Sequence, residues 1–105
     1  MRMLLRVSIP VETGNAAVRA GTLSATIQRI VRELNPEAAY FFADDDGQRS
    51  GSIVFDMKDS SQIPAIAEPW FLEFNAKVSF RPVMSPQDLD AAAPGMTAAV
   101  QQNPG

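Results

Sequence analysis

The sequence predicts an α+β domain of the ferredoxin-like type, with the element order β-α-β-β-α-β, a four-stranded antiparallel sheet and both helices on one face. Three observations lead to this prediction. Two runs of aromatic and β-branched residues, 38–44 and 49–57, flank the polar gap Asp45-Asp46-Gly47-Gln48, which is typical of a β-hairpin. A strand-like alternation precedes them, and two segments with helical periodicity lie on either side of the hairpin.

Composition restricts the function classes. With 105 residues the chain is long enough for one domain with a modest core. It has no cysteine and no histidine, which removes thiolate chemistry, the commonest general base near neutral pH and the commonest metal ligand. We therefore expect neither a cofactor nor a metal. The net charge of −3 and the pI of about 4.7 argue against a nucleic-acid partner.

The N-terminal Met1–Leu5 is too short for a signal sequence because Arg6 interrupts it, and no apolar run approaches the roughly 20 residues of a membrane helix. The sequence therefore predicts a soluble, cytoplasmic protein without a membrane partner.

The first strand covers 3–9, where apolar residues alternate with others until Pro10 ends the strand. A helix from about Asn15 to Leu34 follows, capped by Thr13 or Asn15 and ended by Asn35-Pro36. Gly21 in its middle suggests close packing, since glycine costs about 1 kcal/mol relative to alanine there. The predicted core stripe is Ala16, Ala20, Leu23, Ile27, Ile30, Val31 and Leu34. The arginines of the opposite side could form an anion-binding face, but a solvated face is the commoner outcome.

The hairpin loop contains Asp44-Asp45-Asp46, which favours a plain turn. An EF-hand calcium loop would require a glutamate at its twelfth position, where this chain has Phe55.

A second helix is expected after the hairpin, with Asp59 or Ser60 as its cap and Gln62 as the capping-box partner. Pro69 should divide it into two pieces, one to about Glu68 and a further turn closed by Asn75.

The fourth strand covers 76–84, with Pro82 at a sheet edge or strand end. Ser85 opens a short helix, the domain ends near residue 90, and 91–105 form an Ala/Pro/Gly-rich arm. This arm is expected to be mobile or to lie on a partner subunit.

Right-handed crossovers are expected to place the first and third strands side by side and parallel in the centre of the sheet. The sheet face without helices is too apolar to face water and too polar for a closed core. We therefore expect two copies to press these faces together as a dimeric α/β barrel with a small cavity inside. The predicted face carries Leu4, Arg6, Ser8, Ser79, Arg81 and Val83, joined by Tyr40 and Phe42 or by Phe41, depending on register.

Five short segments carry a resemblance: 6–10 (RVSIP), 36–41 (PEAAYF), 55–57 (FDM), 68–71 (EPWF) and 82–84 (PVM). With them the chain resembles, over about residues 2–90, a family of short bacterial proteins to which no function is assigned. That family is similar in layout to the dimeric α/β-barrel superfamily, which includes muconolactone isomerases and cofactor-free monooxygenases. The resemblance implies a homodimer and a central cavity. The histidines of several such enzymes are missing here.

The candidate ligand-binding residues are the polar and aromatic groups expected around the cavity and its mouth: Arg6, Tyr40, Asp56, Arg81, Glu68 and Trp70, with Glu37 near them. Arg6 and Asp56 could form a buried pair that orients an anionic or enolic ligand, or a structural ion pair at the dimer interface. Tyr40 could donate a proton to a carbonyl, or serve only as an interface aromatic. Glu68 beside Trp70 could be a general base with a raised pKa. More often such a tryptophan is a core anchor and the glutamate is solvated.

Two hypotheses follow. In the first, the homodimeric barrel binds a small aromatic or carboxylate-bearing molecule, with cofactor-free isomerase or monooxygenase chemistry if any reaction occurs. In the second, the protein is a non-catalytic dimerisation or regulatory module whose cavity is filled by side chains. An open pocket lined by Arg6, Tyr40 or Trp70 would favour the first.

Overall fold

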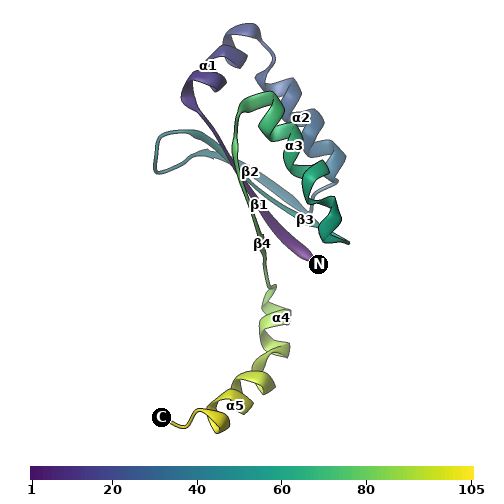
Figure 1. Ribbon diagram of the computed structural model, residues 1–105, viewed down its shortest axis with the longest axis vertical. Coiled ribbons are helices and arrows are strands. Elements are labelled where there is room, and N and C mark those ends of the chain that lie inside the picture. Colours follow the sequence, from purple (N-terminus) through teal and green to yellow (C-terminus); the bar gives the residue numbers. More distant parts are fainter.

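The computed structural model describes all residues from 1 to 105 and shows a layer of helices on one side of a single β-sheet, with a helical arm extending away from it (Figure 1). Its elements are β1 (Arg2–Ile9), α1 (Val11–Ala20), α2 (Leu23–Leu34), β2 (Ala38–Ala43), β3 (Arg49–Asp56), a 3-10 turn (Ser60–Gln62), α3 (Ile63–Phe74), β4 (Lys77–Pro82), α4 (Pro86–Ala91) and α5 (Ala93–Gln102).

The strand order is β2-β3-β1-β4, and every neighbouring pair is antiparallel. This confirms the ferredoxin-like α+β fold and the central position of β1 and β3. The expectation that β1 and β3 run parallel is wrong. The crossover through α1 and α2 gives β1 and β2 the same direction, and the tight hairpin then reverses β3.

Alternate residues of the strands divide the sheet into a covered and an open face. Met3, Leu5, Val7 and Ile9 of β1 are buried beneath the helices, as the alternation predicted. They share the core with Ile30, Ile53, Phe55, Met57, Trp70, Phe74 and Ala76. Burying this stripe supplies the main hydrophobic stabilisation of the fold.

The predicted helix from Asn15 to Leu34 is two helices. Gly21 has φ 74°, a left-handed conformation that ends α1, and its backbone N–H bonds to Ala17 and Val18 carbonyls. The close packing expected at Gly21 is wrong, since no atom lies within 4 Å of a Cβ built there. The start was also misplaced: α1 begins directly after Pro10, whose carbonyl accepts from the Gly14 N–H at 2.9 Å. Asn35, with φ 48°, ends α2 as expected.

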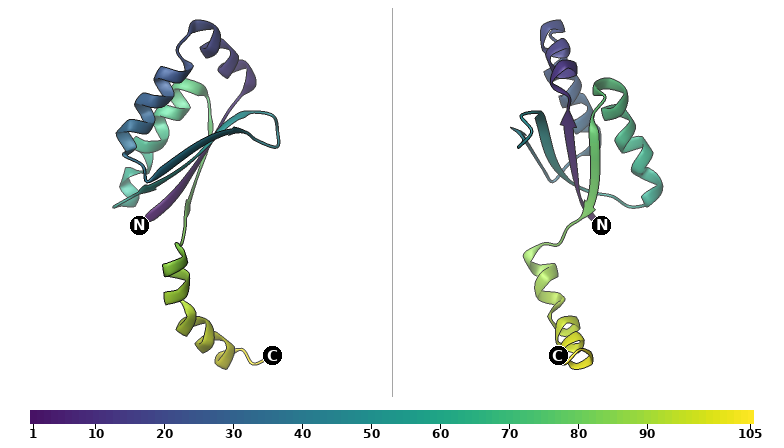
Figure 2. Two further views of the ribbon diagram at one scale, coloured as in Figure 1. Left: turned by 180° about the vertical axis from the view of Figure 1, so that it is seen from behind. Right: turned by 60° about the vertical axis from the view of Figure 1, so that its left-hand side comes forward.

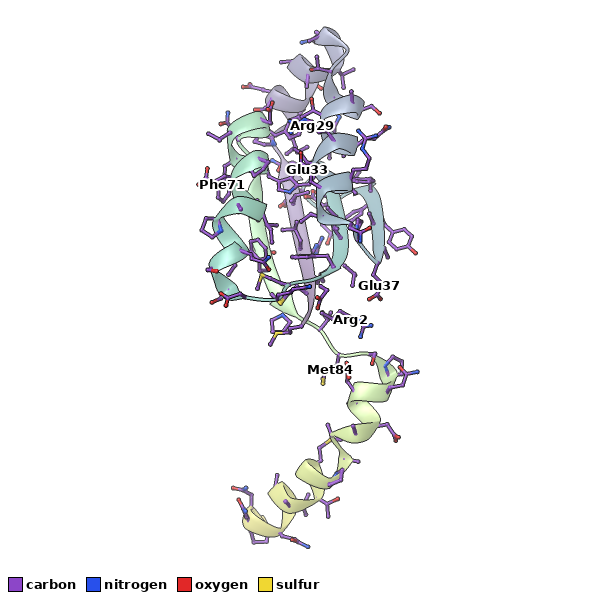
Figure 3. The ribbon with its side chains drawn as sticks, turned by 90° about the vertical axis from the view of Figure 1, so that its right-hand side faces the viewer. Arg2, Arg29, Glu33, Glu37, Phe71 and Met84 are labelled. Carbon is purple, nitrogen blue, oxygen red and sulfur yellow. The ribbon has the colours of Figure 1, made fainter.

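The break changes which residues face the core. Ala17, rather than the predicted Ala16 and Ala20, packs against it. The arginines of the outer side are exposed, as expected of a solvated face. Arg29 contacts Glu33 at 4.0 Å and Glu73 of α3 at 3.4 Å, so it connects the two packed helices (Figure 3).

The second helix is continuous, so the predicted division at Pro69 is wrong. α3 runs through Pro69 and buries Ala67, Trp70 and Phe74. The packing of this apolar side outweighs the hydrogen bond that proline removes. The ends were predicted correctly: Asp59 and Gln62 form the capping box, and Asn75 closes the helix with φ 50°.

β4 is an edge strand, and Pro82 is its last residue, as expected. Ser85 and Asp88 form a capping box that starts α4, and Pro94 lies in the first turn of α5. Both helices are fully exposed and project away from the sheet beyond the end of β4 (Figure 2). Whether the arm is mobile or lies on a partner stays a prediction.

Candidate functional site

The open face of the sheet gathers the side chains that the sequence singled out. Strand register places residues of the four strands in rows across it. One row is Tyr40, Ser52, Arg6 and Ser79; its neighbours are Phe42, Ser50, Ser8 and Lys77 on one side and Ala38, Val54, Leu4 and Arg81 on the other. The register thus resolves the alternatives left open for β2: Tyr40 and Phe42 join this face, and Phe41 lies on the opposite one.

Three cations of this face have no ion-pair partner. Arg6 projects from the central strand, and Lys77 and Arg81 project from β4; none of them forms a salt bridge, whereas Arg2 and Arg29 do. A hollow of about 210 Å³ lies among them, with serine side chains on its floor. Its lining is Arg6, Val7, Ser8, Asp44, Ser50, Lys77, Val78, Ser79 and Arg81.

An aromatic wall faces these cations from β2. Tyr40 is 70% exposed and Phe42 is 38% exposed, although both are large rings on a regular strand. The guanidinium carbon of Arg6 lies 5.5 Å from the centre of the Phe42 ring, within the range of a cation–π contact. We call this arrangement the trough: the aromatic wall (Tyr40, Phe42), the serine floor and the cationic wall (Lys77, Arg81), with Arg6 between the walls.

Asp44 closes one end of the trough but is not a free base. Its carboxylate accepts from Ser50 Oγ at 2.7 Å, Ser8 Oγ at 2.9 Å, and the backbone N–H groups of Asp46 and Gln48 at 2.9 and 3.0 Å. These bonds, with that from Ser50 the largest influence, lower the pKa of Asp44 to about 2. Asp44 therefore fixes the hairpin, and the plain-turn interpretation is confirmed.

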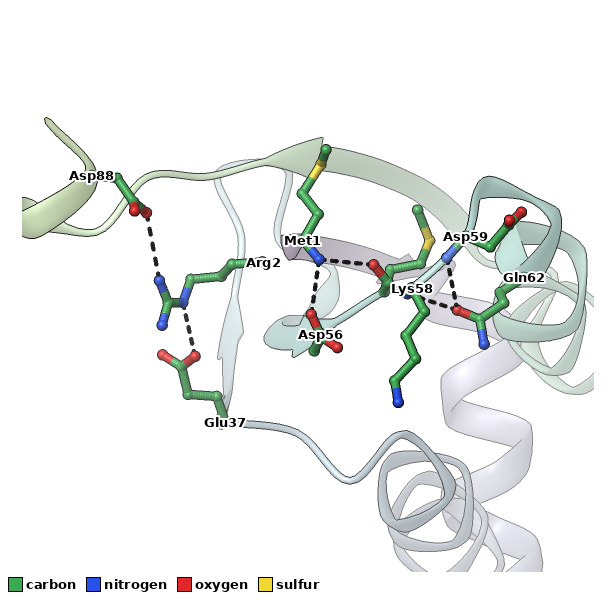
Figure 4. A network of polar contacts seen from close by, with 9 residues as sticks. Met1, Arg2, Glu37, Asp56, Lys58, Asp59, Gln62 and Asp88 are labelled. Atoms are coloured by element: carbon green, nitrogen blue, oxygen red, sulfur yellow. Dashed lines mark hydrogen bonds and ion pairs between the residues drawn. The ribbon is translucent and has the colours of Figure 1, made fainter. Parts of the chain in front are cut away.

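The predicted Arg6–Asp56 pair does not form within the chain. Asp56 lies opposite Arg2, four residues from Arg6 and so about 13 Å along the strand. Its carboxylate binds the N-terminal ammonium at 2.8 Å, which lowers the pKa of Asp56 (Figure 4).

Arg2 has its own partners at the same end of the sheet. Its guanidinium pairs with Glu37 at 2.8 Å and with Asp88 of α4 at 3.7 Å (Figure 4). Glu37 therefore belongs to this terminal network and lies away from Arg6.

Glu68 and Trp70 lie on the other side of the sheet, so their expected place near the open-face cavity is wrong. Both belong to α3, which covers the core. Trp70 is fully buried and Glu68 is exposed, which matches the core-anchor alternative. The indole N–H of Trp70 has no hydrogen-bond partner, although buried indoles usually find one.

A second hollow, which the sequence did not reveal, lies between the helices and the hairpin. Its volume is about 700 Å³, and its lining includes Val7, Ile9, Leu23, Ile27, Phe41 and Trp70. Gly51 was the one sign of this hollow in the sequence. Its missing side chain leaves room for the Phe41 ring, which would lie 3.0 Å from a Cβ built there. Arg49, also in the lining, donates to Asn15 Oδ1 at 3.1 Å, so this larger space has less unpaired charge than the trough.

No group of three or more carboxylates is close enough to hold a metal ion. None of the helices has both the length and the apolar character needed to cross a membrane.

Comparison with known proteins supports the fold. No protein-family model matches the chain, and no curated protein matches it. Among solved structures, a formyltetrahydrofolate deformylase from Pseudomonas putida KT2440 is similar, with a TM-score of 0.50 and 14% sequence identity. The similarity covers 79% of this chain and 29% of the deformylase chain. This chain therefore spans less than a third of that enzyme, and at such identity the likeness shows a shared fold only.

Proposed function

We propose that this domain binds a small organic molecule with both an aromatic ring and a carboxylate in the trough. The observation that carries the proposal is the set of three unpaired cations, Arg6, Lys77 and Arg81, facing the exposed rings of Tyr40 and Phe42. A carboxylate would gain charge-assisted hydrogen bonds from the cations, which are stronger than neutral ones. A ring attached to it would pack on the aromatic wall.

Arg6 is the central residue of this proposal. It projects from one of the two inner strands, so its backbone is fixed by neighbours on both sides. Its planar guanidinium can bind a carboxylate through two parallel N–H donors. Lys77 and Arg81 can adjust around ligands of different length because they project from the edge strand β4.

The volume of the hollow beside the cations bears on the second hypothesis. About 210 Å³ in one copy is less than the 300–1,000 Å³ usual for ligand pockets, and neither Tyr40 nor Phe42 lines this hollow. We propose that the protein acts as a homodimer and that the second copy extends the binding surface of the trough. In the alternative, a dimerisation or regulatory module, side chains of the second copy would fill the trough completely.

Face-to-face closure of two copies into a barrel stays a prediction. It would place Arg6, Lys77 and Arg81 of both copies in one cavity, and like charges at close range repel. Closure of this kind therefore requires an anionic ligand.

Binding is better supported than turnover. The isomerase or monooxygenase chemistry implied by resemblance would have to use Tyr40 as its proton donor, because Asp44 already accepts four hydrogen bonds. Tyr40 is exposed on the aromatic wall and faces the position where the ligand ring would lie.

A thermal-shift measurement with matched probes tests the proposal. Benzoate, 4-hydroxybenzoate and phenylacetate should raise the melting temperature, whereas benzamide, which lacks the charge, and acetate, which lacks the ring, should not. A ligand at 100 times its Kd adds about 2.7 kcal/mol to the free energy of unfolding. Arg6→Gln should abolish the shift. Arg32→Gln, which removes an exposed arginine from α2 on the other side, should leave it intact. Equal shifts from benzoate and benzamide would rule out recognition of the carboxylate.

A further inference from the structure

The two edges of the sheet differ sharply in chemistry. The β2 edge, Ala38–Ala43, has the sequence AAYFFA, with no charged residue and no proline. β2 pairs with β3 only, so its outer side presents unpaired backbone N–H and C=O groups. In the right-hand view of Figure 2 this hairpin lies on the outside of the sheet, away from α3 and β4. An uncharged, apolar edge of this kind is a template for pairing with another strand.

The β4 edge is protected against such pairing. It carries Lys77 and Arg81, and Pro82 lacks a backbone donor. Charged residues and proline are the usual means by which proteins keep an edge strand from pairing with another chain. The protection is thus present on one edge and missing on the other.

We propose that a second copy of this chain pairs antiparallel through β2, about a two-fold axis at Phe41, and extends the sheet to eight strands. The register follows from the hairpin. Asp44 N–H donates to the Gln48 carbonyl, and hydrogen-bonded positions alternate along an antiparallel strand. The backbone groups directed outward therefore belong to Ala39, Phe41 and Ala43. With the axis at Phe41, these three positions pair with Ala43, Phe41 and Ala39 of the second copy.

The side chains in this register complement one another. On the covered face, Phe41 of one copy lies opposite Phe41 of the other, and this residue is 52% exposed in the single chain. On the open face, Tyr40 of one copy lies opposite Phe42 of the other. Aromatic cross-strand pairs of this kind stabilise antiparallel sheets. The two-fold axis passes through the Phe41 pair and repeats the Tyr40–Phe42 contact on both sides of it, as a homodimer requires.

The same pairing adds to the aromatic wall and to the larger hollow, and it leaves the 210 Å³ hollow beside β4 unchanged. The second copy's rings extend the aromatic wall of the trough, and the second Phe41 lies at the mouth of the hollow lined by Phe41 and Trp70. It also keeps the cations of the two troughs apart, unlike face-to-face closure. The register brings Glu37 opposite Asp45 at each end, both exposed and therefore screened by salt. The inference rests on the proposed homodimer and is independent of which ligand is bound.

Position 41 allows a charge-swap test. Only in this register does residue 41 of one copy lie opposite residue 41 of the other. Light scattering of the full chain should give twice the monomer mass of 11.4 kDa at tens of micromolar. Phe41→Lys and Phe41→Glu should each give monomers, because like charges then face each other. A one-to-one mixture of the two variants should recover a dimer, which also shows that both fold.

Phe71→Lys is the matched control. Phe71 is a phenylalanine of similar exposure, 40%, on α3 and away from the β2 edge (Figure 3). This variant should remain dimeric. A wild-type monomer at several hundred micromolar overturns the proposal, and so does a Phe41→Lys dimer as tight as that of Phe71→Lys. A dimer that survives Phe41→Lys but is lost in Tyr40→Lys would show face-to-face closure instead.

Amide hydrogen exchange supplies a second measurement on the unmodified chain. The outward amides of Ala39, Phe41 and Ala43 should become protected as protein concentration rises, whereas those of β4 should not change. The probes bind through Arg6, which does not belong to the β2 edge. If no probe raises the melting temperature but the β2 amides still become protected as concentration rises, the ligand proposal fails and the pairing through β2 stands.

Discussion

The covered and open faces of the sheet are built from alternate residues of the same strands, yet they serve different purposes. Leu5 is fully buried beneath the helices, and the adjacent Leu4 and Arg6 lie on the open face. The side chains of the covered face pack against one another, so this face contributes to the free energy of unfolding. The open face keeps charged and aromatic groups in contact with water, and it is the face on which we propose binding. A single strand can thus contribute to the core with one set of residues and to an exposed surface with the other.

The largest expected effect is at Trp70 on the covered side. Trp70→Ala should lower the free energy of unfolding by about 3–5 kcal/mol, because a large, fully buried ring leaves a cavity. Trp70→Phe should cost clearly less, since the lost indole N–H has no partner. Chemical denaturation monitored by circular dichroism measures both. A Phe variant as unstable as the Ala variant would show that the N–H is bonded in solution.

The two neighbouring leucines sharpen the comparison further. Leu5→Ala should cost about 2–5 kcal/mol, as expected for a fully buried leucine. Leu4→Ala removes the same atoms from the open face and should cost only a fraction of that, because Leu4 is half-buried. Urea denaturation of both variants checks this. Equal losses would mean that the open face is covered in solution, and their concentration dependence would identify a second copy as the cover.

The smallest effect concerns pH and the end of the trough. Hydrogen bonds lower the pKa of Asp44 from the ordinary 3.8 to about 2. A lowered pKa in the folded state contributes stability that is complete above about pH 4 and is lost as the pH falls through about 2. Asp44→Asn should therefore lose less stability than the wild type between pH 4 and pH 2. Melting curves at closely spaced pH values measure the difference. If the stability of the two proteins falls with pH in the same way, Asp44 does not contribute to the loss of stability in acid.

The sequence predicted those features of the fold that depend on local chemistry. The alternation of residues 3–9, the hairpin around Gly47, and the helix ends at Asn35 and Asn75 follow from side-chain periodicity and backbone conformation, and each is confirmed. Gly21 was harder because a glycine inside a helical pattern can be tolerated or can end the helix. Pro69 was misjudged because the burial of Trp70 and Phe74 compensates for its lost hydrogen bond, and burial is not a local property.

The candidate site was predicted in part, for a similar reason. Which residues of one strand share a face is fixed by alternation, so Leu4, Arg6, Ser8, Ser79 and Arg81 were placed together correctly. Which residues lie opposite each other depends on the direction and the register of neighbouring strands. The Arg6–Asp56 pair failed because β1 and β3 run antiparallel, which places Arg2 opposite Asp56. The two alternatives for β2, Tyr40 with Phe42 or Phe41, could not be told apart because they depend on register. Gly51 settles the second question, because only a residue without a side chain leaves space for Phe41 on the covered face.

The C-terminal arm has a consequence for the size of the particle. A chain of this length folded as a sphere would have a radius of gyration of about 13 Å, whereas the structure has 17.6 Å and a longest dimension of 59 Å. Residues 86–102 thus account for much of the elongated shape of each copy, although all of them are exposed and bury little surface against the domain. Removing everything after Met84 should shrink the scattering envelope of each copy and leave its melting temperature nearly unchanged, which makes shape and stability separately adjustable in this protein.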